Sequence, residues 1–312
     1  MNVLVLLNCS AGSGADAKAE RGAQVQQAFA RHGVEATISI VVGPQIAQAA
    51  RKFRDMHPSG AGAGHDALVV AGGDGSISAA AAELAGSDLP LGILAFGTLN
   101  HFAKDLGLPL DLDAAVQVIA AQQTRRIDVG RLNDRVFVNN SSVGLYPFMV
   151  ASRNDGQRRF GLSKLAATLP ALARTLLGAS WHRLDIVLAG ERQRVRTPCV
   201  FVGNNRYATD IATFGTRDRL DSGQLCVFVV RGQTRLGLLL LPFRIALHLA
   251  DRSRDVETFS AAGVEIFSRR KHLHVSLDGE IAAMQTPLRY ACQPGALCVL
   301  APPPAVAVAA AE

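Results

Sequence analysis

The sequence predicts an α/β N-terminal domain with a parallel sheet and a β-rich, sandwich-like second domain, with the active-site cleft between them. Apolar strands alternate with helical patterns through the first 128 residues or so. Frequent short apolar runs with turn residues between them follow after about Arg126. We place the first domain at residues 1–128, the second at 129–302 and a frayed tail at 303–312, and the last strand has the option of returning to the first domain.

The first domain is a series of strand–helix units. Gly33 ends its first helix, and the stretch from His57 to Gly64, rich in Gly, Pro and Ser, forms a loop. The expected strands are Val3–Leu7, Thr37–Val42, Leu68–Ala71 and Leu91–Ala95, and the expected helices are Ala15–Arg31, Gln45–Met56 and Ile77–Ala85. In such a domain, ligands bind at the carboxyl ends of the strands.

The second domain is expected to hold several antiparallel strands and two helical stretches. The strands are Arg135–Asn139, Leu184–Leu188, Cys199–Val202, Leu225–Val230, Val264–Phe267, His274–Leu277 and Leu297–Leu300. The helical stretches are Leu162–Leu177 and Leu236–Leu249.

Composition limits the class of protein. A net charge of +6 and a pI near 9.4 favour an acidic partner. The 5% aromatic content and the lack of a basic stripe with interleaved aromatics argue against nucleic acid. The most apolar run, Leu236–Phe243, is too short to span a membrane, and five cysteines without metal spacing indicate reduced thiols in a cytoplasmic protein.

The most informative segment is Val69–Ser76, an apolar strand that runs into Gly72, Gly73, Asp74, Gly75 and Ser76 and then a helix. Glycines let backbone N–H groups approach an anion, and a helix N-terminus adds partial positive charge. Asp74 is expected to face Mg²⁺ or its water beside a polyphosphate. The alternative is a plain glycine turn with Asp74 as the helix N-cap.

Two further turns of this type follow strands of the same sheet. Leu94–Ala103 contains Gly97, Thr98 and Asn100, and the segment from Asn8 to Gly14 contains Ser10 and Gly12. Since the carboxyl ends of parallel strands share one edge, the three turns are expected to converge. Neither a P-loop nor a Gly-x-Gly-x-x-Gly motif is present, so a nucleotide would be held by a different binding motif.

These motifs, followed by Arg219–Leu225 and by Leu277-Asp278-Gly279-Glu280, closely resemble the diacylglycerol kinase catalytic family, which includes bacterial soluble lipid kinases and sphingosine kinases. The resemblance extends from Asn8 to about Pro302. Gly-Gly-Asp-Gly alone is shared with NAD kinases and phosphofructokinases, whereas four motifs in order are specific.

The resemblance implies an ATP- and Mg²⁺-dependent kinase that phosphorylates a lipid hydroxyl, with Glu280, alone or together with Asp278, as general base. The residues that it implies around the nucleotide are Asn8, Ser10, Gly12, Gly72–Ser76, Gly97, Thr98 and Asn100. Taken alone, Asp278-Gly279-Glu280 would be an ordinary hairpin turn with solvated acids.

The sequence departs from the family pattern at three points. His101 replaces an Asp, Ser222 replaces the second Asp of an Asp-Asp-Gly turn, and the segment near Val42 lacks an expected Thr. A second-domain Mg²⁺ would therefore depend on Asp221 or Asp218. Asp128 is either part of a water network toward Mg²⁺ or a salt-bridged surface acid.

The expected partners are ATP and a lipid at the cytoplasmic face of the membrane, with peripheral contact and no nucleic acid; a homodimer is one option. The basic and apolar stretch Arg158–Leu177 either rests on an anionic membrane or packs on the sandwich. Two other functions remain open: phosphorylation of a soluble acceptor such as NAD, and a nucleotide-binding regulator with weak catalysis. The acceptor lipid has no short sequence signature.

Overall fold

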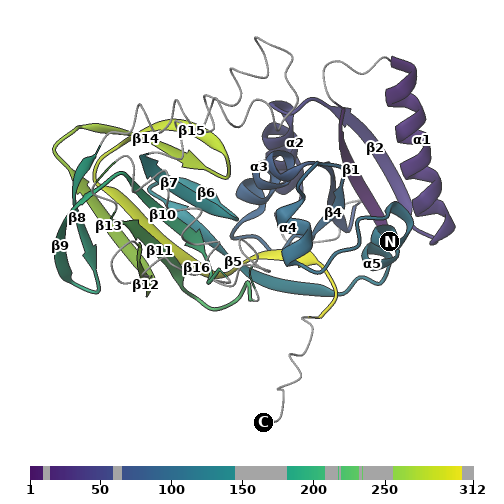
Figure 1. Cartoon of the computed structure of the whole chain (residues 1–312). Helices are drawn as coiled ribbons and strands as arrows, with labels where there is room; N and C mark the ends of the chain where they lie inside the picture. Colours follow the sequence, from purple (N-terminus) through teal and green to yellow (C-terminus); the bar gives the residue numbers. More distant parts are fainter. Residues whose placement is uncertain are drawn as a thin grey trace. The chain divides into compact units, whose positions relative to one another are not determined.

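A computed structural model of the chain describes residues 1–9, 15–58, 65–144, 181–207, 217, 219–231, 234 and 256–303 (Figure 1). These residues divide between two compact units. The first unit comprises Met1–Val129, Gly215–Ser222 and Gln293–Glu312, and the second comprises Gly130–Phe214 and Gly223–Cys292. The two expected helical stretches of the second half, at 162–177 and 236–249, lie outside the described residues.

The first unit is the α/β domain that the sequence predicts. Its parallel strands are ordered β2-β1-β3-β4, with the end of β16 beside β4. The elements are β1 (Asn2–Asn8), α1 (Ala15–Arg31), β2 (Glu35–Val41), α2 (Gln45–Met56), β3 (Ala67–Gly72), α3 (Asp74–Leu84), β4 (Leu91–Ala95), α4 (His101–Asp105) and α5 (Leu112–Ala120). The chain continues into β5 (Thr124–Leu132).

Both faces of this sheet are covered, because alternate strand residues point to opposite sides. Val3, Val5 and Leu7 of β1 belong to a buried cluster that includes Phe29 of α1 and Ile119 of α5. Helices α2 and α3 pack against each other and contact β1, β3 and β4. The inner strands β1, β3 and β4 are therefore almost continuous apolar runs, as expected for a doubly covered parallel sheet, whereas the edge strand β2 mixes apolar and polar residues and is partly exposed.

An ion pair is buried inside the first unit. Arg217 Nε donates to Asp105 Oδ2 at 2.8 Å, and both side chains are at most 3% exposed. The Arg217 backbone N–H also donates to Asp105 Oδ1, at 3.3 Å, and its guanidinium lies 6.0 Å from the centre of the Phe102 ring. The pair ties α4 to a segment more than a hundred residues further along the chain.

The second unit is a sandwich of antiparallel strands, which also confirms the predicted fold class. One layer has the order β12-β11-β10-β7-β14-β15. The other contains β9, β8, β13 and the first part of β16. The strands are β6 (Arg135–Phe137), β7 (Asn140–Gly144), β8 (His182–Leu188), β9 (Glu191–Thr197), β10 (Cys199–Asn204), β11 (Leu225–Val230), β12 (Val256–Ala261), β13 (Gly263–Ser268), β14 (His272–Leu277), β15 (Glu280–Gln285) and β16 (Leu288–Leu300).

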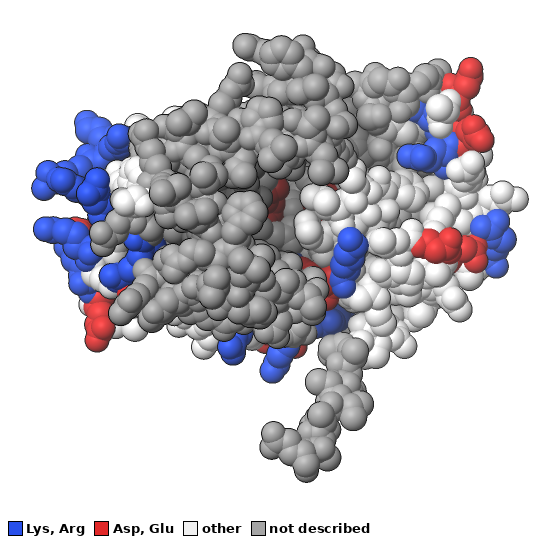
Figure 2. Space-filling view, viewed as in Figure 1, with Lys and Arg blue, Asp and Glu red and all other residues white. Residues whose placement is uncertain are grey.

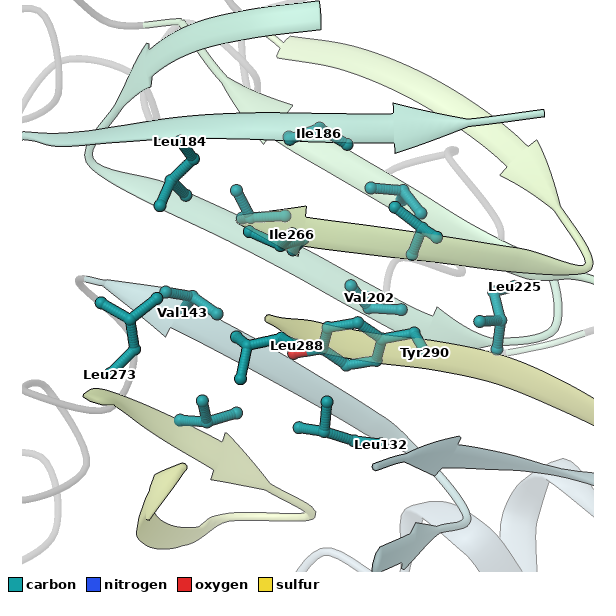
Figure 3. Close-up of a cluster of buried hydrophobic side chains, with 14 of the residues drawn as sticks. Leu132, Val143, Leu184, Ile186, Val202, Leu225, Ile266, Leu273, Leu288 and Tyr290 are labelled. Carbon is teal, nitrogen blue, oxygen red and sulfur yellow. The ribbon is translucent and has the colours of Figure 1, made fainter. Parts of the chain in front are cut away.

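Side chains from both layers meet in one core (Figure 3). Val143 and Val202 come from one layer, and Ile186, Ile266 and Leu288 come from the other. Tyr290 brings a hydroxyl into this core, where it lies 3.0 Å from Ser141 Oγ. Burial raises the pKa of the Tyr290 hydroxyl far above its usual value, so it stays protonated and can hydrogen-bond to Ser141.

The buried ion pair leads to a stability prediction. Arg217→Met is expected to lower the free energy of unfolding by about 3–5 kcal/mol, because it leaves the Asp105 carboxylate buried without its partner. The double variant Arg217→Met/Asp105→Leu should recover most of this loss. Urea unfolding followed by circular dichroism measures both. Equal destabilisation of the single and double variants would contradict this account of the pair.

Candidate active site

The expected turns of the first unit follow β1, β3 and β4, and the described parts of them touch. Asn8, the last residue of β1, donates from Nδ2 to Ser76 Oγ in the first turn of α3, at 2.6 Å. The Phe96 N–H after β4 donates to the Gly72 carbonyl at the end of β3, at 2.9 Å. The structure thus brings Asn8, Gly72 and Ser76 to one edge of the sheet. Ser10 and Gly12 lie outside the described residues.

Glycines provide space in the turns after β3 and β4, and Gly97 lets the two turns meet backbone to backbone. A Cβ on Gly97 would lie 2.7 Å from Gly73 Cα and 2.6 Å from Asn100 Oδ1. A Cβ on Gly72 would lie 2.9 Å from Ser76 Cβ. Real Cβ atoms do not approach other atoms so closely, so each of these positions requires glycine for space rather than for an unusual φ angle.

Asp74 neither caps its own helix nor is fully free. Helix α3 begins at Asp74, three residues earlier than the expected Ile77, and its N-cap is Gly73 in an extended conformation without a side-chain cap. The reading of Asp74 as N-cap is therefore wrong. Its Oδ1 accepts from the Phe102 N–H in the first turn of α4, at 3.2 Å. The carboxylate links α3 to α4, and its Oδ2 has no hydrogen-bond partner among the residues that the structure describes.

The start of α3 presents backbone donors. The Ser76 and Ile77 N–H groups both donate to the Gly73 carbonyl, whereas those of Asp74 and Gly75 have no acceptor within the described part of the chain. The first N–H groups of a helix have no partner inside it, and an anion can accept from them. This end of α3 can hold a phosphate group.

Asn100 and Thr98 follow on the turn after β4. Asn100 is buried and left-handed, with φ 52°, and its Nδ2 donates to the Gly97 carbonyl at 3.0 Å. Its Oδ1 is buried and has no hydrogen-bond partner among the described residues. Thr98 and His101 are exposed on either side. A buried acceptor without a partner, beside the contact between Gly73 and Gly97, fits a ligand that carries donors, such as a nucleotide or its hydrated Mg²⁺.

The Asp278-Gly279-Glu280 motif forms the hairpin turn between β14 and β15. Both Asp278 and Gly279 have positive φ, 47° and 90°, as the turns preferred in two-residue hairpins require. Asp278 is not a solvated acid: its oxygens accept from the N–H groups of Val138, Asn139 and Asn140 at 2.8–2.9 Å. The Glu280 side chain is exposed and has no hydrogen bond or ion pair within the described ranges.

A second hairpin of the same unit provides an internal comparison. Leu188-Ala189-Gly190-Glu191 turns between β8 and β9 with positive φ at Ala189 and Gly190, as Leu277-Asp278-Gly279-Glu280 does. Ala189 in place of Asp278 still forms the turn. The Asp278 carboxylate is therefore not required for the hairpin, and its distinctive role is to fix the backbone that leads into β7.

The acids expected near a second Mg²⁺ are not gathered in what the structure describes. Asp221 Oδ1 accepts from Arg219 Nε at 3.1 Å, and Asp218 lies outside the described residues. No group of three metal-binding side chains occurs within the described ranges. Asp128 is only 2% exposed and accepts from the Gly295 N–H at 2.9 Å, so its reading as a surface acid is wrong.

Sequence analysis missed a set of buried polar atoms on the outer face of the six-stranded layer. Ser142 and Ser276 are directly opposite in the β7–β14 pair, and both are fully buried. Their hydroxyls, and Asn140 Oδ1 two residues before Ser142, have no hydrogen-bond partner among the described residues. Neither serine belongs to a motif, so the sequence carried no signal for this pair.

The stretch Arg158–Leu177 lies outside the described residues. In the part of the chain that the structure describes, no helix combines the length and apolar character needed to cross a bilayer.

Comparisons with known proteins identify the family. Residues 2–132 match the model described as the diacylglycerol kinase catalytic domain, and residues 149–301 match that of the YegS C-terminal NAD kinase beta sandwich-like domain. A protein of Chromohalobacter salexigens named "Probable lipid kinase YegS-like" is 30% identical, over 77% of each chain. A Mycobacterium tuberculosis protein named "Diacylglycerol kinase" is 38% identical over 42% of this chain and 40% of its own.

Solved structures agree on the fold. A Bacillus anthracis structure titled as a diacylglycerol kinase has a TM-score of 0.65 and 18% identity over 97% of both chains. Another structure from that organism has a TM-score of 0.72 and 22% identity over 97% of this chain and 95% of its own. The sequence matches show that the chain belongs to the diacylglycerol kinase catalytic family of lipid kinases.

Proposed function

We propose that this protein transfers the γ-phosphate of ATP to the hydroxyl of a diacylglycerol-like or sphingoid lipid, with Glu280 as general base. The observation that carries the proposal is the contact between Gly73 and Gly97, which assembles donors and an orphaned acceptor at one sheet edge. The family of the chain supports the lipid as acceptor.

The first unit supplies the nucleotide-binding groups. The N–H groups of Asp74 and Gly75 and the α3 N-terminus would hold phosphate oxygens, with Asn8, Ser76 and Thr98 beside them. Mg²⁺ bound with ATP neutralises phosphate charge and would use Oδ2 of Asp74, in keeping with the one or two protein carboxylates that such sites need. These residues fit a nucleotide with its metal.

The second unit supplies the base. Glu280 would take the proton of the acceptor hydroxyl as that oxygen attacks the γ-phosphorus and the bond to the bridging oxygen breaks, releasing ADP. Asp278 already accepts three backbone hydrogen bonds, so we assign it to positioning β7 and the turn rather than to proton transfer.

The lipid substrate would lie against the outer face of the six-stranded layer. Ser142 and Ser276 offer two buried hydroxyls without partners, and Phe201 lies opposite Ser142 in the next strand pair. Ester or hydroxyl oxygens of a lipid would satisfy such hydroxyls, and aromatic rings suit its chains. A lipid acceptor also places the working enzyme at the cytoplasmic face of a membrane, where ATP is present.

Glu280→Gln is expected to lower kcat by about 100- to 10,000-fold with ATP binding retained, because the amide cannot accept the proton. Transfer of labelled phosphate to mixed lipids measures kcat, and calorimetry measures ATP binding. Glu191→Gln is the matched control, since Glu191 follows the same type of turn. Equal activity of wild type and Glu280→Gln would refute the base assignment. Transfer to NAD without lipid would indicate the soluble acceptor instead.

Gly97→Ala is expected to weaken ATP binding at least ~10-fold and to lower the free energy of unfolding by about 1–3 kcal/mol, because the new Cβ pushes the two turns apart. Thermal unfolding with and without ATP measures both effects. Gly22→Ala in α1, where a Cβ meets only side chains at 3.8 Å or more, should retain binding. If ATP raised the unfolding temperature of Gly97→Ala as much as that of wild type, the Gly73–Gly97 contact would have no role in ATP binding.

Ser142→Ala/Ser276→Ala is expected to raise the KM for lipid by about 10- to 100-fold, the cost of two neutral hydrogen bonds. The KM for ATP should stay the same. The free energy of unfolding should not fall, since the hydroxyls have no partner within the described residues. Steady-state kinetics with detergent-dispersed lipid measures both constants. Thr197→Val, which removes a buried hydroxyl that donates to the Val230 carbonyl, should lower stability alone. A lipid KM equal to that of wild type would exclude the two serines from the lipid site.

A further inference from the structure

Arginines line the outer face of the layer β16-β13-β8-β9 in the second unit. The register pairs Arg183 with Arg196, Asp185 with Arg194 and Val187 with Arg192 across β8 and β9. Directly paired residues point to the same side of a sheet. The intervening residues, such as Leu184 and Ile186, point to the core of the sandwich. The arginine face, as we call it, consists of Arg183, Arg192, Arg194, Arg196 and, beyond β13, Arg289.

The turn between β13 and β14 adds Arg269, Arg270 and Lys271, all exposed. With the arginine face these make eight basic residues, against three acids, Asp185, Glu191 and Glu265, in the same strands and turns. The resulting net charge of +5 compares with +6 for the entire chain. Figure 2 shows Lys and Arg gathered at the end of the molecule where Figure 1 places β8 and β9. No basic stripe with interleaved aromatics was expected from the sequence, because the arginines alternate with other residues and come from separate strands.

The acids of the region neutralise only some of these charges. Asp185 pairs with Arg194 at 3.0 Å and Arg192 at 3.4 Å, which lowers its pKa, and Glu265 pairs with Arg289 at 3.1 Å. Arg183, Arg196 and Arg270 have no carboxylate within ion-pair distance in the part of the chain described. Burial and the nearby Arg270 lower the pKa of His182, so this residue adds no charge at neutral pH. An external partner with anionic groups would supply the ion pairs that these three arginines lack.

Aromatic residues indicate which partner fits. Trp181, the one tryptophan of the chain, directly precedes β8, with the Arg196 guanidinium 6.0 Å from its ring centre. Tryptophan and arginine together favour the head-group region of a membrane. Phe267 is covered by Arg192, 5.0 Å away, and offers no open ring for stacking a nucleic-acid base.

We propose that the arginine face, with the Arg269–Lys271 turn, docks the protein on membrane surfaces rich in anionic lipids. The inference rests on the proposed function, because a lipid kinase must reach an acceptor that lies in a bilayer. Basic residues near such a surface are attracted over about a Debye length, so the docking is reversible and sensitive to salt.

The test measures sedimentation of the full chain with vesicles of phosphatidylcholine, alone or mixed with phosphatidylglycerol. Wild type should bind the anionic vesicles preferentially and lose binding as salt rises. Arg183→Gln/Arg196→Gln/Arg270→Gln should bind them on the order of 100-fold more weakly, since each Lys or Arg near an anionic bilayer contributes about fivefold. Lys18→Gln/Lys52→Gln/Arg135→Gln, which removes the same charge from elsewhere on the described surface, should bind like wild type.

Three results would overturn the proposal: no preference of wild type for anionic vesicles, equal losses in the two triple variants, or duplex DNA binding that only the arginine-face variant loses while its vesicle binding persists. Circular dichroism confirms that the variants fold. The binding assay needs neither ATP nor turnover, whereas kinase activity on detergent-dispersed lipid tests the proposed function separately. The arginine-face variant should retain that activity.

Discussion

The approach of Gly73 to Gly97 is the constraint on which the candidate nucleotide site depends. Parallel strands β3 and β4 lie side by side, so the turns that leave them would normally be separated by side chains. Without Cβ atoms the two backbones meet, and the N-terminus of α3, the Asn100 amide and the Asp74 carboxylate are brought to one place. A fixed arrangement of donors suits phosphoryl transfer, where positioning and charge neutralisation account for most of the catalysis.

Carboxylates stabilise this arrangement by accepting backbone hydrogen bonds. Asp74 accepts from the first turn of α4, Asp128 accepts from Gly295, and Asp278 accepts from three successive N–H groups that lead into β7. A charged acceptor makes stronger hydrogen bonds than a neutral one and fixes the backbone more firmly. Acids that look catalytic in the sequence are thus partly engaged in structure, and this distinguishes Glu280, exposed and unpaired among the described residues, from Asp278.

The sequence was sufficient for regular elements and insufficient for long-range polar contacts. The bounds of α1, α2, β4 and β11 agree with those expected, because amphipathic spacing and flanking turn residues define them locally. Strand β16 runs from Leu288, nine residues before its expected start, since Pro294 and Gly295 interrupt the apolar pattern without ending the strand. Strand β9 was not expected, because it is polar and contains no apolar run. Helix α5 was also missed, although Asp111 caps its N-terminus.

In the candidate site, too, local features could be predicted from the sequence and long-range contacts could not. Glycine turns after strands were readable because their spacing is local, and the structure joins Asn8, Gly72, Ser76 and Gly97 as expected. The Arg217–Asp105 pair and the Ser142–Ser276 pair were not readable, because each joins residues more than a hundred positions apart. No local pattern reports such a pairing, and each residue alone is ordinary for its position.

Charge is unevenly distributed between the two tasks of a lipid kinase. The candidate nucleotide site uses backbone N–H groups and a helix end rather than a cluster of lysines, so its affinity for phosphate depends on geometry that salt screens weakly. The arginine face and the Arg269–Lys271 turn together account for most of the net charge, and they are exposed, so the proposed attraction to anionic lipid would be easily screened. Ionic strength should therefore act on membrane encounter far more than on nucleotide binding. Under the proposed function and docking, the enzyme would leave one bilayer and reach another while its nucleotide remains bound.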